Sequence, residues 1–300
     1  GDALGSTLAW YHFLCQKGHE AVVISPNDYP DFLKWLPGED EILKQNQKPL
    51  EIQEKILNAD LIFTLDFNAL GRVQELTDLV RKALGEKIMI DHHEAPESYA
   101  SLQYSDPSMS STCEMVYKVI QALDENAFNK EIASCLYTGI MTDTGSFRYS
   151  ATTSETHLAI SHLIRAGADG TEIHQKIYDS SSLNRLKLLG ITLSNLQEIP
   201  DLPIVFMTLT QEELTSCNYQ KGDTEGFVNY GLSLEDIVFS CILIENESEG
   251  KIKMSFRSQG TFSVNEFART YFNGGGHHNA AGGMSMDSME TTIARFKNAV

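Results

Sequence analysis

Short continuous runs of apolar residues recur in the first hundred residues, and helix-like stretches separate them. The runs have the length of strands and lie at residues 21–25, 61–65 and 87–90, while residues 5–18 carry apolar positions at helical spacing. Strands that are apolar on both faces are typical of a parallel sheet covered by helices on each side. The pattern therefore predicts an α/β domain, with functional side chains just past the carboxyl ends of its strands.

The pattern changes further along the chain. Residues 108–198 are predicted to be mostly helical, with Ser111 and Glu114 spaced as a capping box and later helices at 154–166 and 183–196. After Pro203, strands are predicted at 204–207, 237–244 and 251–257, followed by a short helix at 264–271. The strand at 251–257 alternates strictly, which places Arg257 on its polar face. We expect a parallel-sheet domain over residues 1–185, a linker helix over 186–200 and a smaller α+β domain over 201–300.

Composition narrows the classes of partner. The 300 residues include 41 acids against 23 Lys and Arg, so the net charge is −18 and a broad basic surface for duplex DNA is excluded. No run of about 18 apolar residues occurs, which argues against a membrane span. The five cysteines lie far apart without a C-x-x-C pair, which disfavours a disulfide framework and indicates the reducing cytoplasm.

Small acids and imidazoles follow several of the predicted elements. They are Asp2, Asp66, the run Asp91-His92-His93, and Asp143. A mixed carboxylate and imidazole set suits Mn²⁺ or a similar divalent cation, and a central carboxylate can bridge two such ions. Bound cations would also allow this acidic chain to accept an anionic substrate. Each aspartate alone is more often a turn or helix-capping residue, and Asp-His-His alone is more often a surface turn.

Two motifs together resemble a known family. Asp91-His92-His93 is similar to the signature of the DHH phosphoesterase family, and the glycine-rich stretch 274–283 is similar to the motif of its DHHA1 domain. The resemblance covers essentially the whole chain and implies a DHH domain with helices on both faces, followed by a DHHA1 domain, with the active site in the cleft between them.

The resemblance also implies roles for individual residues. Asp66 matches the ligand that bridges two metal ions, and Asp2, His92 and Asp143 match ligands of one of them. His93 matches the residue that faces the substrate phosphate, and Asp91 is expected to orient the neighbouring imidazole. The family motif has a His and an Asp a few residues before the position of Asp2, so we expect native residues to precede Gly1.

In the second domain, the resemblance implies that an arginine and the glycine-rich loop contact the nucleotide part of the substrate. These roles fall on Arg257, Gly275, Gly276 and His277. Glycines let backbone N–H groups approach a phosphate closely, and a guanidinium binds phosphate oxygens in pairs. Without the resemblance, the glycines would be interpreted as a flexible turn, and Arg257 could equally be an ordinary exposed arginine.

The segments 143–147 and 110–114 resemble the bacterial nanoRNase/pAp-phosphatase branch of the family. That branch hydrolyses short oligoribonucleotides and dinucleotides such as pApA to mononucleotides, and pAp to AMP. The expected cofactor is two Mn²⁺ ions, with Mg²⁺ or Co²⁺ as alternatives, and the expected nucleophile is a hydroxide bridging the ions near Asp66. The sequence leaves open whether the protein forms a homodimer. The alternatives are an exopolyphosphatase or pyrophosphatase of the same superfamily, or a non-catalytic nucleotide sensor.

Overall fold

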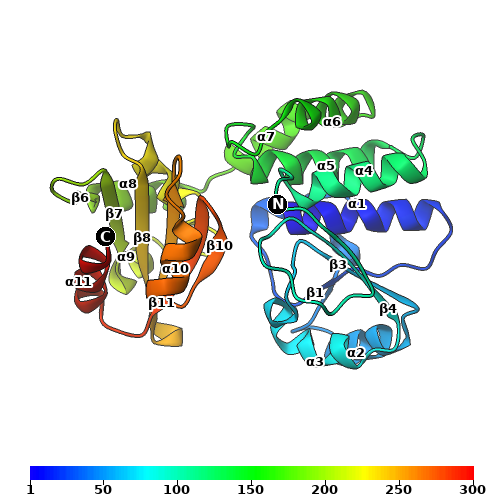
Figure 1. Ribbon diagram of the computed structural model, residues 1–300, viewed down its shortest axis with the longest axis horizontal. Helices are drawn as coiled ribbons and strands as arrows, with labels where there is room; N and C mark the ends of the chain where they lie inside the picture. The colour runs from blue at the N-terminus through cyan, green and yellow to red at the C-terminus, as the bar shows by residue number, and fades with distance from the viewer. The chain divides into compact units, whose positions relative to one another are not determined.

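The computed structural model describes residues 1–300, which form two compact units, residues 1–180 and 181–300 (Figure 1). The predicted fold class is confirmed: the first unit is α/β with parallel strands, and the second is a smaller α+β unit. The helix expected at 186–200 as a linker is α8, Leu183–Ser194, and it groups with the second unit. Its Leu188 is fully buried in a cluster with Met207 and Leu214 of that unit.

The first unit contains a three-stranded parallel sheet in the order β3-β4-β5. The strands are β3 Leu61–Leu65, β4 Glu86–Asp91 and β5 Leu102–Ser105. The strand predicted at 21–25 is shorter: β1, Ile24–Ser25, pairs in parallel with β2, Leu43–Lys44, in a separate two-stranded sheet. The sequence analysis missed β5, because Leu102 and Gln103 are exposed and form no apolar run.

Both faces of this sheet are covered, as the apolar strands predict. Along β3, Ile62 packs in one hydrophobic cluster, while Phe63 and Leu65 pack in another on the opposite face. The helices of this unit are α1 Asp2–Gln16, α2 Pro49–Asn58, α3 Thr77–Lys82, α4 Thr112–Leu123, α5 Lys130–Asp143, α6 Ser154–Arg165 and α7 Gly170–Tyr178. Residues of α2 and α3 fill the first cluster, and residues of α1, α4 and α5 fill the second.

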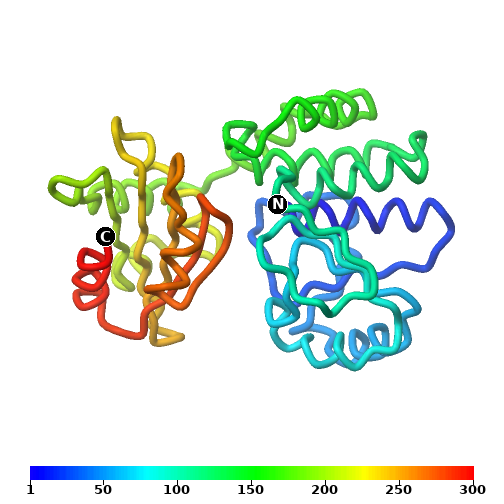
Figure 2. The backbone as a smooth tube through the Cα atoms, in the orientation of Figure 1, coloured from blue at the N-terminus to red at the C-terminus, as the bar shows by residue number.

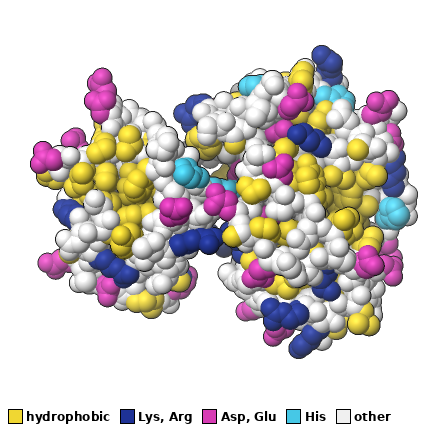
Figure 3. All heavy atoms as spheres, in the orientation of Figure 1, with side chains coloured by type: hydrophobic (Ala, Val, Ile, Leu, Met, Phe, Trp, Pro, Cys, Tyr) yellow, Lys and Arg dark blue, Asp and Glu magenta, His cyan; other side chains and the backbone are white.

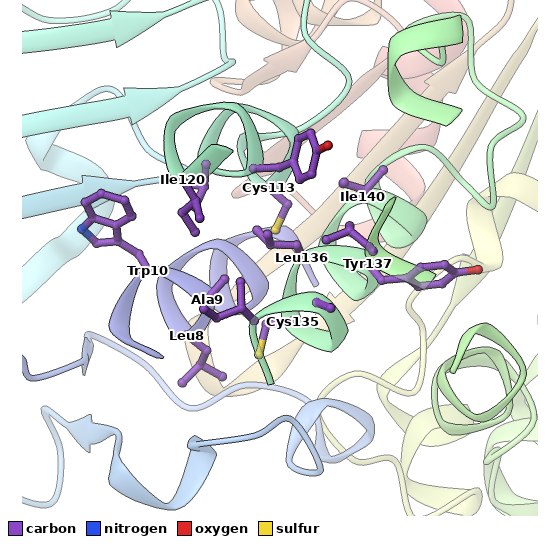
Figure 4. Packing of buried hydrophobic residues seen from close by; sticks show 14 of the residues in the cluster. Leu8, Ala9, Trp10, Cys113, Ile120, Cys135, Leu136, Tyr137 and Ile140 are labelled. Atoms are coloured by element: carbon purple, nitrogen blue, oxygen red, sulfur yellow. The ribbon is translucent and has the colours of Figure 1, made fainter. Parts of the chain in front are cut away.

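The larger cluster is built where α1, α4 and α5 meet. Figure 4 shows Leu8, Ala9 and Trp10 of α1 among side chains of the other two helices, which include the buried Cys113 and Cys135. A Cβ on Gly5 of α1 would lie 2.5 Å from the carbonyl oxygen of Cys135 in α5. The two helices therefore approach closely at this glycine, near the beginning of α1.

The expected capping box at α4 forms only in part. Ser111 is the N-cap, and its hydroxyl accepts a hydrogen bond from the backbone N–H of Glu114 at 3.0 Å. The Glu114 carboxylate is buried and accepts hydrogen bonds from the hydroxyls of Ser110 and Thr156 instead of turning back to the N-cap. These buried hydroxyls compete with the backbone N–H of Ser111 for the carboxylate, and sequence spacing alone does not reveal them.

The second unit is built on a six-stranded sheet in the order β10-β11-β9-β8-β7-β6. The strands are β6 Gln197–Glu198, β7 Ile204–Leu209, β8 Phe239–Asn246, β9 Lys251–Ser258, β10 Gly275–His277 and β11 Ala280–Ser285. All neighbours are antiparallel except β7 and β8. The glycine-rich stretch is therefore not a flexible turn, because it forms the hairpin of β10 and β11 at one edge of this sheet.

Helices cover the two faces of this sheet through separate hydrophobic clusters. The helices besides α8 are α9 Gln211–Ser216, α10 Val264–Tyr271 and α11 Met289–Ala299. Phe206 and Phe256 pack with Phe267 of α10 and Phe296 of α11, while Met207 on the opposite face packs with residues of α8 and α9. The strict alternation predicted for residues 251–257 is confirmed, since Ile252, Met254 and Phe256 are buried.

None of the helices combines the length and apolar character that crossing a bilayer requires. On the face shown in Figure 3, Lys and Arg side chains lie singly or in small groups among Asp and Glu side chains.

Candidate active site

Residues far apart in the sequence meet at the carboxyl ends of β3 and β4. Asp66 follows β3 directly, Asp91 ends β4, and His92 and His93 come next. Because β3 and β4 are neighbouring parallel strands, these segments emerge at the same edge of the sheet. Asp66 has a φ of 64°, in the left-handed region, which Asp tolerates better than most side chains.

The two remaining predicted ligands come from helix ends. Asp2 is the first residue of α1, and Asp143 is the last residue of α5. Figure 2 shows that the chain begins beside the segment that leads into α4, a proximity that hydrogen bonds between Asp2 and α4 confirm. The first unit thus brings together all four of the predicted metal ligands.

His92 lies at the centre of the carboxylates. Its Nε2 is 3.2 Å from an oxygen of Asp143, 3.7 Å from one of Asp2 and 3.9 Å from one of Asp66. Its Nδ1 lies 3.1 Å from the carbonyl oxygen of Met109. Since a carbonyl only accepts hydrogen bonds, Nδ1 carries a proton and donates it there, and Nε2 is the nitrogen turned toward the carboxylates.

The beginning of α4 holds the Asp2 carboxylate. The backbone N–H groups of Thr112 and Cys113 donate to its two oxygens at 2.7 and 2.8 Å. Gly139 of α5 leaves room for this arrangement, because a Cβ there would lie 2.1 Å from the Cys113 sulfur and 3.0 Å from an Asp2 oxygen. The sequence analysis missed Thr112 and Gly139, although the segment 110–114 had stood out as a helix start.

His93 is oriented by Asp91. Its Nδ1 lies 2.7 Å from Asp91 Oδ1, and its backbone N–H donates to Asp91 Oδ2 at 2.8 Å. The side-chain amide of Asn68, which the sequence analysis also missed, donates to the carbonyl oxygens of His93 and Glu94, both at 3.0 Å. Asn68 thereby ties the loop that carries Asp66 to the loop that carries the histidines.

The predicted nucleotide-binding residues lie together in the second unit. Arg257 of β9 pairs in register with Ala280 of β11, and Ala280 pairs with His277 of β10, so these residues lie on three adjacent strands. The side chain of Asn265, from α10, accepts a hydrogen bond from the backbone N–H of Gly276 at 2.9 Å. A Cβ on Gly274 would lie 1.9 Å from the carbonyl oxygen of Gly282, so the hairpin requires glycine at that position.

Comparisons with known proteins find a matching domain family for each of the two units. A family model described as the DHH family, N-terminal domain, matches residues 1–140, and one for the DHHA1 domain matches residues 201–300. The bifunctional oligoribonuclease and PAP phosphatase NrnA of Thermus thermophilus is 32% identical over 94% of this chain and 80% of its own length. The chain belongs to the DHH family. The family membership that the two motifs predict is confirmed. The predicted enzyme class, a hydrolase of phosphoester bonds, is confirmed as well.

Two further proteins extend the comparison. The NrnA protein of Bacillus subtilis is 31% identical over 70% of this chain and 66% of its own length. A crystal structure of an exopolyphosphatase-related protein from Bacteroides fragilis matches with a TM-score of 0.95 and 43% identity, covering 99% of this chain and 87% of that one. The fold is therefore that of a solved structure over nearly the whole chain.

Burial and mutual repulsion destabilise the charged forms of Asp2 and Asp66. Burial, followed by the charges of Asp2 and Asp143, raises the pKa of Asp66 well above its usual value. Burial, followed by the charge of Asp143, also raises the pKa of Asp2. Asp91 differs: burial alone would raise its pKa, but the hydrogen bonds and charge of His93 outweigh it and hold the pKa below the usual value.

This donor set fits a divalent metal ion. One ligand atom from each of Asp2, Asp66 and His92 lies within 4.8 Å of the others, and the same holds for Asp66, Asp91 and His93. Carboxylate oxygens and imidazole nitrogens suit Mn²⁺, Zn²⁺ and related ions. A bound cation would also stabilise the ionised carboxylates that burial disfavours. Asp2, Asp66 and His92 are therefore able to hold such an ion, and Asp143 lies beside them, with a carboxylate oxygen 3.2 Å from His92 Nε2.

Metal binding is expected to release protons. Burial alone would lower the pKa of His92, but its hydrogen bond with Asp143 and the charges of Asp2 and Asp66 raise the pKa to about 10. A ligating imidazole must be neutral, so Mn²⁺ has to displace this proton, and its affinity should rise with pH between about 6 and 9. Calorimetric titration in buffers of different ionisation enthalpy should show release of at least one proton, and a buffer-independent heat would contradict this.

Proposed function

We propose that the protein hydrolyses short oligoribonucleotides, including pApA, to mononucleotides and pAp to AMP, using Mn²⁺ held by Asp2, Asp66, His92 and Asp143. The observation that carries the proposal is the cluster of the buried Asp2 and His92 with the partly buried Asp66, in a chain whose Thermus relative is named an oligoribonuclease and PAP phosphatase. The first unit, with the DHH motif, would perform the chemistry. The second unit, with the DHHA1 motif, would bind the nucleotide.

Asp66 takes the central role in this proposal. Its carboxylate lies close to both motif histidines, at 3.9 Å from His92 Nε2 and 3.9 Å from His93 Nδ1. Divalent ions held here would activate water near neutral pH and neutralise charge on the phosphate. Asp66 would keep the reacting atoms in place, because its carboxylate belongs to both sets of ligand atoms. One set also contains Asp2 and His92, and the other contains Asp91 and His93.

His93 would contact the phosphate. Its Nδ1 hydrogen bond to Asp91 fixes the ring and its tautomer, so that Nε2 is on the side of the ring away from Asp91. When the ring is protonated at both nitrogens, Nδ1–H donates to Asp91 and Nε2–H can donate to an oxygen of the phosphate and stabilise its developing charge. Asp91 would act only through His93.

The nucleotide end of the substrate would be held by Arg257, Gly275, Gly276 and His277. A guanidinium can bind a phosphate through two parallel hydrogen bonds, and glycine backbone allows close approach of N–H groups. The half-buried Arg257 is already oriented, because its Nη1 donates to the carbonyl oxygen of Phe256 at 2.9 Å.

One observation favours a second candidate function. The solved structure that matches at 43% identity is described as exopolyphosphatase-related. A polyphosphate or pyrophosphate substrate would use the same metal ligands but would need no contact to a base or ribose. The two functions therefore differ in what the second unit must bind.

The test measures all substrates side by side. The protein expressed from its complete reading frame is supplied with Mn²⁺ and given pApA, pAp, polyphosphate and pyrophosphate, with Asp66→Ala as control. We expect mononucleotides from pApA and AMP from pAp, and neither product from the variant. Faster hydrolysis of polyphosphate than of both nucleotides would favour the second candidate, and binding of pApA without turnover would favour a sensor.

Arg257→Ala should separate substrate binding from metal binding. Loss of a charge-assisted contact costs about 1.5–3 kcal/mol, so we expect the KM for pApA to rise about 10- to 100-fold. Mn²⁺ affinity, measured by calorimetry, should be unchanged. Lys253→Ala is the matched control, because Lys253 is an exposed cation on the same side of β9. Equal loss of metal and dinucleotide binding in Arg257→Ala would contradict the assigned role.

A further inference from the structure

Thr112 contacts two carboxylates that belong to different parts of the first unit. It is fully buried at the beginning of α4. Its backbone N–H donates to Asp2 Oδ2 at 2.7 Å, and its hydroxyl donates to Asp66 Oδ1 at 3.3 Å. One residue thus connects the start of α1 with the loop after β3.

We propose that Thr112 is a positioning residue that sets the spacing between Asp2 and Asp66, so that both can serve the same metal centre. The inference rests on the metal centre of the proposed function. Thr112 touches neither reacting atoms nor nucleotide in this role, because it acts only through the two carboxylates.

The two carboxylates differ in how firmly the protein holds them. Asp2 receives two backbone N–H groups, from Thr112 and Cys113. The Asp66 carboxylate receives one hydrogen bond, from the Thr112 hydroxyl, while the nearest histidine nitrogens lie 3.9 Å away. Since two neighbouring carboxylates with little exposure to water repel each other, a donor anchored to one and bonded to the other opposes their separation. Loss of the hydroxyl should therefore release Asp66 and leave Asp2 in place.

The chemistry of threonine permits a clean separation of its two roles. Thr112→Val keeps the branched shape and the backbone N–H that holds Asp2, and removes only the donor to Asp66. Thr112→Ser keeps the hydroxyl and removes a methyl group. Thr192→Val is the matched control, because Thr192 is also fully buried in a helix and its hydroxyl donates to the carbonyl oxygen of Leu188, in the second unit.

The first readout is Mn²⁺ affinity without substrate, measured by calorimetry. Partners that orient metal ligands typically contribute 10- to 100-fold in affinity. We expect Thr112→Val to bind Mn²⁺ about 10-fold or more weakly, and Thr112→Ser and Thr192→Val to stay within about threefold of the parent protein. At limiting Mn²⁺, kcat for pApA should fall in Thr112→Val with KM for pApA unchanged, and added Mn²⁺ should restore part of it.

Several outcomes would overturn the inference. Parent-like Mn²⁺ affinity in Thr112→Val would show that the hydroxyl does not position Asp66. Equal loss in Thr112→Ser would show that packing, not the hydrogen bond, matters. If the parent protein shows no Mn²⁺ binding that Asp66→Ala removes, the metal centre itself is wrong, and the role of Thr112 fails with it. This last result concerns the proposed function and is distinguishable from the first two.

Discussion

Asp66→Asn is expected to abolish phosphoesterase activity while making the metal-free protein more stable. Activity on pApA should fall at least about 1000-fold, because the variant lacks the carboxylate common to both groups of ligand atoms. The metal-free variant should gain about 1–3 kcal/mol, because a buried charge repelled by Asp2 and Asp143 is removed. Thermal unfolding in the presence of EDTA, together with hydrolysis assays, checks both effects.

The stability gain has a defined pH dependence. Because the pKa of Asp66 is raised in the folded state, the folded protein binds this proton more tightly than the unfolded chain. The stability that this group contributes is present below its unfolded pKa, about 4, and is lost as pH rises through the folded value. The melting temperatures of Asp66→Asn and the parent protein should therefore converge at low pH and separate toward neutral pH.

A matched control is available at the other end of the same strand. Asp60 precedes β3 and is exposed, so Asp60→Asn should change neither activity nor the pH dependence of stability. A lower melting temperature for metal-free Asp66→Asn at neutral pH would contradict the electrostatic argument. Retained activity would show that Asp66 is not a ligand that the reaction needs.

Gly139→Ala is expected to damage both stability and metal binding by a single added methyl group. Its Cβ would lie 2.1 Å from the Cys113 sulfur and 3.0 Å from an Asp2 oxygen, so either the helices or the carboxylate must move. Overpacking of this kind typically costs about 1–3 kcal/mol. We expect a clear fall in melting temperature and Mn²⁺ binding that is at least about 10-fold weaker.

A double variant separates the two effects. Cys113→Ala removes the sulfur from the clash, so Gly139→Ala with Cys113→Ala should recover much of the stability. Metal affinity should recover less, because the new Cβ still lies against Asp2. Gly190→Ala is the control, since nothing lies within 4 Å of its Cβ in helix α8, and it should stabilise by about 0.5–1 kcal/mol. Additive costs in the double variant would contradict the steric account.

The sequence by itself determined the architecture and the identity of most of the charged groups in the site. Apolar runs at 61–65 and 87–90 predicted buried parallel strands, because only a strand covered on both faces lacks polar alternation. The alternation at 251–257 placed Arg257 on a polar face, because successive side chains of a strand point to opposite faces of the sheet. Asp66 and Asp91-His92-His93 were recognisable because they end such strands, where parallel topology gathers functional groups.

The tertiary structure decided the features that depend on contacts between segments distant in the sequence. Edge strand β5 has exposed side chains and so leaves no apolar run. Glu114 had the right spacing for a capping box, but buried hydroxyls of Ser110 and Thr156 compete for it. Thr112 and Gly139 look like ordinary helix residues in the sequence. Their contacts with Asp2 arise only when α1, α4 and α5 pack together, because such contacts depend on distances between segments more than 100 residues apart.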